Sequence, residues 1–235
     1  MKPLEVFSNI SRYRLCAVSQ RHAGCDGVGL GSGTALVHKG DLFVVTCAHV
    51  ANPEDDGVEL GSVIFDGAPP VGPDQLEVAF LDRDLDLALL RVSKAARHRL
   101  QHLQPIEVES LATMEQFAAA QPADGHGYAF IGSPWESRKE QGYGVLFRTI
   151  AYRARVKSND GVRRLTLSYE AGANEEPLPA PGGISGCTLF MLDTPEGPGL
   201  WTPGKAIAVQ HHWNKGEKHV ICSPIAPIRE FLLRG

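Results

Sequence analysis

Residues 31–50 read GSGTALVHKGDLFVVTCAHV, and this stretch decides the fold class. A glycine-flanked apolar run is followed by the turn signal HKGD and then by a second apolar run, LFVVTCAHV. Two short apolar runs joined by a tight polar turn are typical of neighbouring antiparallel strands. The pattern therefore predicts two β-strands, the second of which ends at a small-residue turn that carries His49.

Short apolar runs and turn signals continue along the rest of the chain. Runs such as SVIF, LEVAFL, LALLRV, YAFIG and CTLFML alternate with turn signals such as NPEDDG, SNDG and TPEGPG. Many short strands with frequent turns indicate a β-sandwich or barrel. Only residues 110–121 and 223–235 have a helical pattern. We therefore expect an all-β protein with a short C-terminal helix.

Length and charge limit the domain organisation and the classes of partner. The chain has 235 residues, and all-β chains of this size often form one domain. We expect one domain over residues 1–235, built from two packed half-barrels near residues 15–110 and 125–225. The net charge is −4, with Lys+Arg 23 and Asp+Glu 27 nearly balanced. Because no block of like charge stands out, we expect neither nucleic acid nor a membrane as a partner.

The apolar runs and the cysteines predict a reduced, cytoplasmic protein. No run is long enough for a signal-peptide core or a membrane span. The cysteines are few, odd in number and without a CxxC pair: Cys16, Cys25, Cys47, Cys187 and Cys222. We expect them to be small buried side chains rather than a disulfide framework. No cofactor or metal is expected, because the adjacent His211 and His212 would point to opposite faces of a strand.

Two stretches contain side chains that suit proton transfer. His49 ends an apolar strand and can act there as a general base on a rigid scaffold. In LDRDLDLALLRV (81–92), Asp86 lies against the apolar run LALL, and a buried carboxylate needs a partner such as the N–H of His49. Asp82, Asp84 and Asp86 alternate with other residues, so we expect them to share one strand face, with Asp84 as the second candidate. The alternatives are an ordinary strand-end histidine and a solvated acidic strand start.

The third stretch is PGGISGCTLF (181–190), which places Ser185 between glycines. Glycine lets the backbone adopt conformations that other residues resist, and successive N–H groups in such a turn can form an anion-binding nest. The N–H groups of Gly183 and Ser185 are therefore candidates to receive the oxyanion of a tetrahedral intermediate. The alternative for this stretch alone is an ordinary Gly/Ser turn.

The three stretches occur in the order His, Asp, Ser, each at the end of a strand. Together with GSGTALV, TCAHV, DLALL, GGISG and GKAIAVQHHW, which span residues 31–213, they resemble the trypsin-like serine protease family in its compact bacterial form without disulfides. The resemblance implies two packed six-stranded antiparallel β-barrels. It also implies a serine endopeptidase in which Ser185 attacks the peptide carbonyl, His49 transfers the proton and Asp86 orients the imidazole.

Two residues depart from the family pattern. Ile184 stands where digestive relatives carry an aspartate that pairs with a newly cut N-terminus, and isoleucine cannot form that ion pair. The resemblance therefore implies a protease that is constitutively competent or is controlled by a partner protein. Cys187 stands where relatives usually carry Gly or Pro, and we expect a buried structural thiol there, with redox sensing as the alternative.

The family builds its specificity pocket from the loop before the nucleophile and the strand after it, here PLPAPGG (177–183) and AVQHHW (208–213). PLPAPGG has no acidic residue, so a preference for Arg or Lys is not supported, whereas the histidines weakly favour Glu or Gln. The candidate substrate-binding residues are Pro181, Gln210, His211 and His212. Alternative functions are an inactive protease-fold binding module, a latent protease switched on by a partner, and a non-catalytic β-sandwich.

Overall fold

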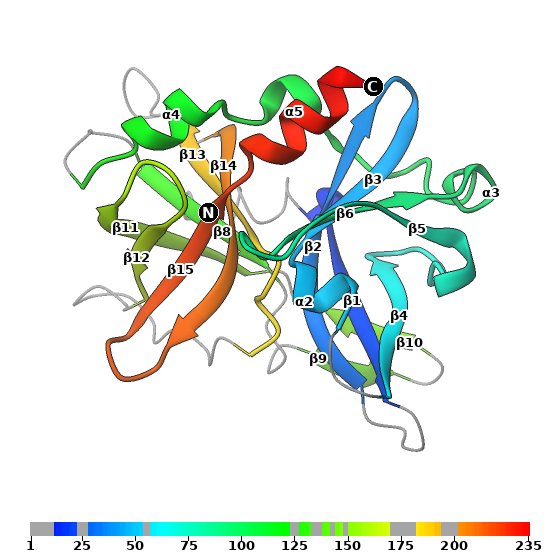
Figure 1. The fold of residues 1–235 in the computed structure, drawn as a ribbon. Helices are drawn as coiled ribbons and strands as arrows, with labels where there is room; N and C mark the ends of the chain where they lie inside the picture. Colours follow the sequence, from blue (N-terminus) through cyan, green and yellow to red (C-terminus); the bar gives the residue numbers. More distant parts are fainter. Residues whose placement is uncertain are drawn as a thin grey trace.

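Two β-sheet units lie side by side in the computed structural model, and the C-terminal helix lies above them (Figure 1). The structure describes residues 12–22, 28–53, 57–122, 127–132, 138–141, 144–147, 150–169, 182–193 and 202–235. The statements below concern these residues.

The first unit is an open sheet. Its antiparallel strands are β1 (Leu15–His22), β2 (Val28–His38), β3 (Asp41–Thr46), β4 (Val58–Phe65), β5 (Leu76–Asp82) and β6 (Leu87–Val92). They pair in the order β4-β1-β2-β3-β6-β5, and β7 (Ile106–Glu107) pairs in parallel with β2. Within the described residues, the end strands β4 and β5 do not pair with each other, although the short 3₁₀-helix η2 (Pro73–Gln75) contacts both.

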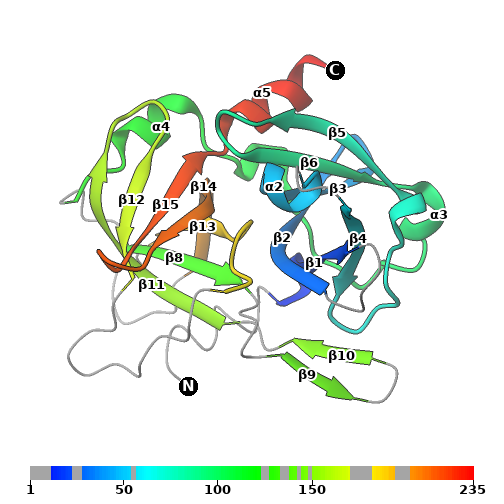
Figure 2. The ribbon, with the colours of Figure 1, turned by 60° about the horizontal axis from the view of Figure 1, so that its bottom comes forward.

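The second unit is a closed barrel. Its strands are β8 (Gly127–Gly132), β11 (Ile150–Asn159), β12 (Leu165–Ser168), β13 (Thr188–Asp193), β14 (Thr202–Asn214) and β15 (His219–Pro224). They pair antiparallel in the closed order β11-β12-β15-β14-β13-β8. Strands β9 (Arg138–Gln141) and β10 (Gly144–Phe147) form a separate antiparallel pair that lies below the first unit in Figure 2.

The expected fold class is confirmed, but only the second of the two expected barrels is closed by strand pairing. The segment between β4 and β5 contains Pro69, Pro70 and Pro73. Val71 of this segment pairs with Val63 of β4 in an isolated antiparallel bridge. The prolines on either side of it have no N–H to donate, which limits this pairing to a single bridge rather than a ladder. The boundary between the half-barrels, expected near residues 105–125, stays a prediction.

The helices are short and lie outside the sheets. They are α2 (Ala48–Ala51), α3 (Lys94–Arg97), α4 (Met114–Ala119) and α5 (Ala226–Arg234), with 3₁₀-helices η1 (Arg12–Arg14) and η3 (Val108–Ser110). Both predicted helices occur in shortened form, and α4 begins after Thr113 because Thr113 and Gln116 form a capping box. The single turns α2 and α3 were not expected, since four residues are too few for a helical pattern. In the described part of the chain, no helix is long and apolar enough to cross a membrane.

The apolar interior consists of two clusters: one lies wholly in the second unit, and the other fills the first unit and extends into strands β8, β13 and β14 of the second. The residues of β6 from Leu87 to Leu90 are fully buried, and all six residues of β8 are buried. The core of the first unit also contains Ile228 and Leu232 of α5, so the C-terminal helix is part of the packing. The units meet where β2 faces β13, and there the hydroxyl of Thr188 donates to that of Thr34 over 2.8 Å, with both residues buried. Apolar packing and this hydrogen bond therefore join the two units.

Candidate active site

His49 is held at the end of β3 by the one-turn helix α2. Cys47, the residue before this helix, has extended backbone angles of φ −82° and ψ 152°, so the chain turns sharply where the buried strand ends. Ala48, Val50 and Ala51 are buried, whereas the side chain of His49 is 48% exposed. Because the rest of the turn packs into the core, the imidazole projects outward from a fixed backbone.

Asp86 lies in the turn between β5 and β6. The expectation that Asp82, Asp84 and Asp86 share a strand face is wrong, because β5 ends at Asp82 and β6 begins at Leu87. Asp82 Oδ1 accepts the backbone N–H of Leu85 over 2.9 Å and thereby stabilises the turn. Asp86 has φ +52°, a left-handed conformation that Asp tolerates better than most residues. The turn, rather than strand alternation, therefore directs the Asp86 carboxylate.

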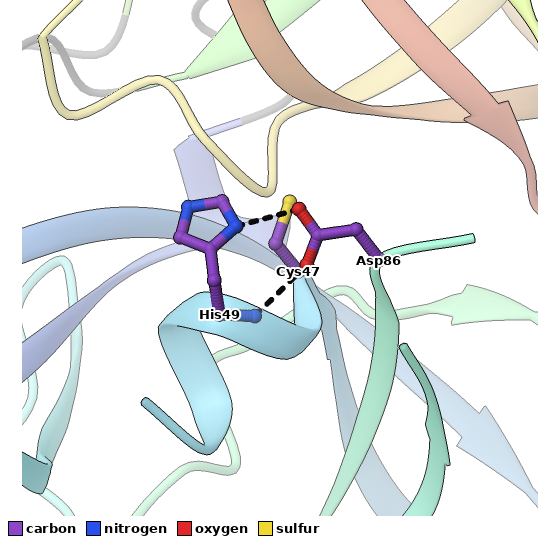
Figure 3. Close-up of side chains that lie close together, drawn as sticks. All are labelled: Cys47, His49 and Asp86. Carbon is purple, nitrogen blue, oxygen red and sulfur yellow. Dashed lines mark hydrogen bonds and ion pairs between the residues drawn. The ribbon is translucent and has the colours of Figure 1, made fainter. Parts of the chain in front are cut away.

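The Asp86 carboxylate binds His49 at two points (Figure 3). Its Oδ2 lies 2.6 Å from Nδ1 of the His49 ring, and its Oδ1 accepts the backbone N–H of His49 over 2.9 Å. A carboxylate next to Nδ1 places the proton of a neutral imidazole on that nitrogen. Nε2 is then the free acceptor, as a general base requires.

The environment keeps Asp86 ionised. Burial raises the pKa of the carboxyl, but the hydrogen bonds from the ring and backbone of His49 outweigh burial and leave the pKa below its usual value. Charges on His49 and His211 act in the same direction. Asp86 is therefore a carboxylate over the whole neutral range and can hold the imidazole in one orientation.

His211 of β14 is a second histidine beside Asp86. Its Nδ1 lies 3.8 Å from Asp86 Oδ2, and its side chain is only 20% exposed. Burial lowers the pKa of His211 to about 4, although the charge of Asp86 opposes that shift, and positive charge on His212, His49 and Arg164 adds to it. His211 is therefore neutral at the pH where the protein is expected to work.

The lowered pKa of His211 makes the stability of the fold depend on pH. Between the usual pKa of 6.5 and the folded value of about 4, the unfolded chain binds a proton that the folded chain does not. The free energy of unfolding should therefore fall as the pH drops through this window, by up to ~3 kcal/mol. Urea denaturation of wild type and His211→Gln at about pH 7 and about pH 4.5 checks this.

In that experiment, the loss of stability between the two pH values should be about 2 kcal/mol smaller in His211→Gln than in wild type. His212→Gln is the matched control, because the neighbouring His212 is exposed and should keep the wild-type pH dependence. Equal losses in wild type and His211→Gln would contradict the burial of a neutral imidazole at this position.

Ser185 lies in a tight turn before β13. Gly183 has φ +84° and Gly186 has φ +92°, and the N–H of Cys187 donates to the Ile184 carbonyl over 2.9 Å. Ser32 of β2 holds the turn from the other unit: its N–H donates to the Ser185 carbonyl over 2.6 Å and its hydroxyl to the Gly183 carbonyl over 2.8 Å. The serine turn is therefore fixed to the first unit by the motif GSG.

The backbone of Gln210 links the serine turn to the histidine segment. Its carbonyl accepts the N–H of Gly186 over 2.8 Å and the thiol of Cys47 over 3.0 Å. Its own N–H donates to the Cys187 carbonyl over 2.8 Å. One carbonyl of β14 thus positions both the segment before His49 and the segment after Ser185.

The predicted substrate-binding residues differ in their exposure. The side chain of Gln210 is buried, and its Oε1 lacks a hydrogen-bond partner among the described residues. His211 is half-buried beside Asp86, and His212 is exposed. Both histidines line a cleft of about 540 Å³ that also contains His49 and Asp86. Pro181 lies outside the described residues.

Sequence reasoning assigned no role to three residues that belong to this region: Ser32, Cys47 and Arg164. Ser32 could have been noticed as the centre of GSG, but its two hydrogen bonds join segments that are about 150 residues apart. No pattern in the sequence indicated a functional role for Arg164, because it follows an ordinary hairpin turn. In the described residues, the hydroxyl of Ser185 makes no hydrogen bond to His49, and in the absence of substrate such catalytic contacts are often loose.

The four described cysteines are Cys16, Cys47, Cys187 and Cys222, and all are buried and form no disulfide with one another, whereas Cys25 lies outside the described residues. Cys47 Sγ, a ring nitrogen of His49 and a carboxylate oxygen of Asp86 lie within 4.8 Å of one another. Burial raises the pKa of the Cys47 thiol well above its usual value, and the charge of Asp86 adds to this. Because a thiolate is the form that binds metals, this trio is a poor metal site.

Comparison with known proteins identifies the family of the chain. The family model of the trypsin-like peptidase domain matches residues 31–187, and the chain belongs to this family. The match confirms the expected family. A peptide is the substrate that the family implies. A search of curated proteins found no match.

Solved structures show a similar fold. The serine endoprotease from Yersinia pestis has a TM-score of 0.59 and 18% identity, over 98% of this chain and 66% of that chain. This chain thus spans just under two thirds of the Yersinia protein. A protease from M. tuberculosis in its active form has a TM-score of 0.49 and 18% identity, over 96% of this chain and 82% of that chain. At such identity, the likeness to the Yersinia protein supports the fold.

Proposed function

We propose that the chain is a serine endopeptidase with Ser185 as the nucleophile, His49 as the general base and Asp86 as the residue that orients it. The observation that carries the proposal is the two-point contact between Asp86 and His49, which leaves Nε2 of the ring free. Membership of the trypsin-like peptidase family supports the same roles. The serine turn is joined to the histidine segment through Gln210, as the roles require.

The proposed reaction has two stages. Ser185 Oγ attacks the carbonyl carbon of the peptide bond while its proton passes to Nε2 of His49. The imidazolium then gives that proton to the leaving amine as the C–N bond breaks, and an acyl-enzyme remains. Water, deprotonated by the same nitrogen, attacks the ester and releases the acid and free Ser185. Asp86 stays ionised throughout and stabilises the transient imidazolium.

The oxyanion is stabilised in this proposal by the N–H groups of Gly183 and Ser185. In the described structure neither group donates a hydrogen bond, while the carbonyls of the same two residues are held by Ser32. Free N–H groups on a restrained backbone are suited to receive developing negative charge. Removing one such donor in a protease of another fold costs about 3–4 kcal/mol of transition-state stabilisation.

Ile184 cannot form the ion pair that activation by a newly cut N-terminus would need. This side chain is 1% exposed and packs in the apolar core of the second unit, where a charged N-terminus would be strongly disfavoured. We infer that the site is either competent as synthesised or controlled by a partner. The activating partner and the cytoplasmic location stay predictions from the sequence.

Covalent labelling tests the proposal. Wild type incubated with a fluorophosphonate probe should gain the mass of one adduct, because the probe reacts with an activated serine hydroxyl. Ser185→Ala should gain none, since the reacting oxygen is absent. Thr188→Ser supplies a control hydroxyl near the site and should label like wild type. A folded wild type that stays unlabelled, both pure and in cell lysate, would favour the inactive binding module.

A further inference from the structure

The cleft beside the His49–Asp86 pair has walls from both units. Its lining residues are His49, Asp86, Arg164, His211, His212 and Ile221. The first two belong to the first unit and the other four to the second. Ser185 does not line this cleft, so the cleft receives a part of the substrate that lies next to the attacked bond rather than at it. A peptide that passes His49 in this cleft also passes Arg164.

The charges in the cleft do not balance. Asp86 is the single carboxylate among the lining residues, and it already binds His49 at 2.6 Å with His211 at 3.8 Å. Arg164 is exposed, and it forms no ion pair with any carboxylate in the described residues. Its charge helps to lower the pKa of Asp160 in the same turn, but no direct ion pair forms between them. The guanidinium therefore offers a planar set of donors that matches a carboxylate at two points.

Arg164 stands on a turn that is held firmly in place. It ends the connection between β11 and β12, where Asp160 Oδ1 accepts the backbone N–H groups of residues 162–164 over 2.8–2.9 Å. The side-chain amide of Asn159 ties the same turn to two carbonyls of α4 and its C-terminal end, over 2.7 and 2.9 Å. Because the Asp160 carboxylate binds the backbone of its own turn, it fixes the backbone that carries Arg164.

Positive charge continues beyond the cleft. A neighbouring hollow of about 530 Å³ is lined by Arg164 together with Lys157, His219 and Glu217, among others. The carboxylate of Glu217 lies 3.1 Å from Nδ1 of His219, and the Lys157 ammonium donates to the backbone carbonyl of Glu217 over 3.5 Å. Arg164 and Lys157 are thus two cations beside one carboxylate, so the basic side chains of this hollow outnumber its acidic ones.

We propose that this protease selects peptides with a Glu or Asp side chain close to the scissile bond, whose carboxylate is bound by the guanidinium of Arg164. The inference rests on the proposed function, because it names the substrate class of the same site. It differs from the pocket expected on residues 177–183 and 208–213, since Arg164 belongs to neither segment. The exposed His212 lines the same cleft.

A fluorogenic peptide library with Glu or Gln at each position around the cleaved bond tests this proposal. Wild type should cleave peptides with Glu at one such position about tenfold faster in kcat/KM than their Gln counterparts, the size expected of a partly desolvated charged contact. In Arg164→Gln the ratio should fall to about one. Arg163→Gln removes an exposed neighbouring arginine outside the cleft and should keep the wild-type ratio. An undiminished ratio in Arg164→Gln, or a ratio of one in wild type, would overturn the inference.

A binding measurement separates this inference from the proposed function. The probe is a fluorescein-labelled peptide of alternating alanine and glutamate, with the matched alanine–glutamine peptide as its control. Ser185→Ala should bind the acidic peptide more tightly than the neutral one, and the Ser185→Ala/Arg164→Gln double variant should bind both alike. Wild type could fail to cleave any peptide while Ser185→Ala still prefers the acidic peptide and the double variant does not. In that case the proposed function fails and the acidic site stands. If both single and double variants bind the two peptides alike, the acidic site fails by itself.

Discussion

Replacing Asp86 with asparagine is expected to lower kcat by about a thousand- to ten-thousandfold without unfolding the protein. The Asp86 carboxylate uses both oxygens on His49, one on the backbone N–H and the other on Nδ1 of the ring. An asparagine that keeps its oxygen on the backbone N–H must place its NH₂ group against Nδ1. The ring proton then moves to Nε2, and the imidazole can no longer accept the proton of Ser185.

The fold should survive this change, because Asn tolerates the left-handed φ of +52° as well as Asp does. The measurement is kcat on one peptide substrate, together with the midpoint of thermal unfolding. Asp84→Asn is the matched control, since Asp84 is exposed in the same turn and should retain wild-type activity. Activity of Asp86→Asn within tenfold of wild type would remove Asp86 from the proposed mechanism.

Gly186→Ala is expected to destabilise the fold by at least ~3 kcal/mol, through backbone strain and overpacking together. Gly186 has φ +92°, a conformation that residues with a Cβ rarely adopt. A Cβ at this position would overlap the carbonyl oxygen of Ser32 and come within 2.5 Å of the Thr46 hydroxyl. These two groups already bond each other over 2.7 Å, so neither can move away without breaking that bond.

Urea denaturation of Gly186→Ala and Gly182→Ala measures the effect. Gly182 is exposed in the same turn, and a Cβ added there would meet no atom within 4 Å, so its variant should stay within ~0.5 kcal/mol of wild type. The serine turn should also shift in any Gly186→Ala protein that does fold, because the N–H of Gly186 bonds the Gln210 carbonyl. A free energy of unfolding within ~1 kcal/mol of wild type would mean that the turn adapts more easily than this packing allows.

Local patterns in the sequence predicted most of the architecture. Alternating apolar runs with turn signals predicted the strands, because a strand buries every second side chain and a turn needs Gly, Pro, Asn or Asp. The apolar run LALL became the buried start of β6, and the C-terminal pattern became α5. The open first sheet was not predicted, since barrel closure depends on pairing between strands that are distant in sequence.

The sequence by itself determined the family, the order of His49, Asp86 and Ser185, and the strands next to them, because these depend on local patterns and residue types. Only the tertiary structure decided that the Asp86 turn directs both oxygens to His49, that Ser32 holds the serine turn, and that Arg164 faces the same cleft. Each of these contacts joins segments that are separated by dozens of residues, and no pattern within one segment specifies how two segments meet. Long-range packing and hydrogen bonding set those positions.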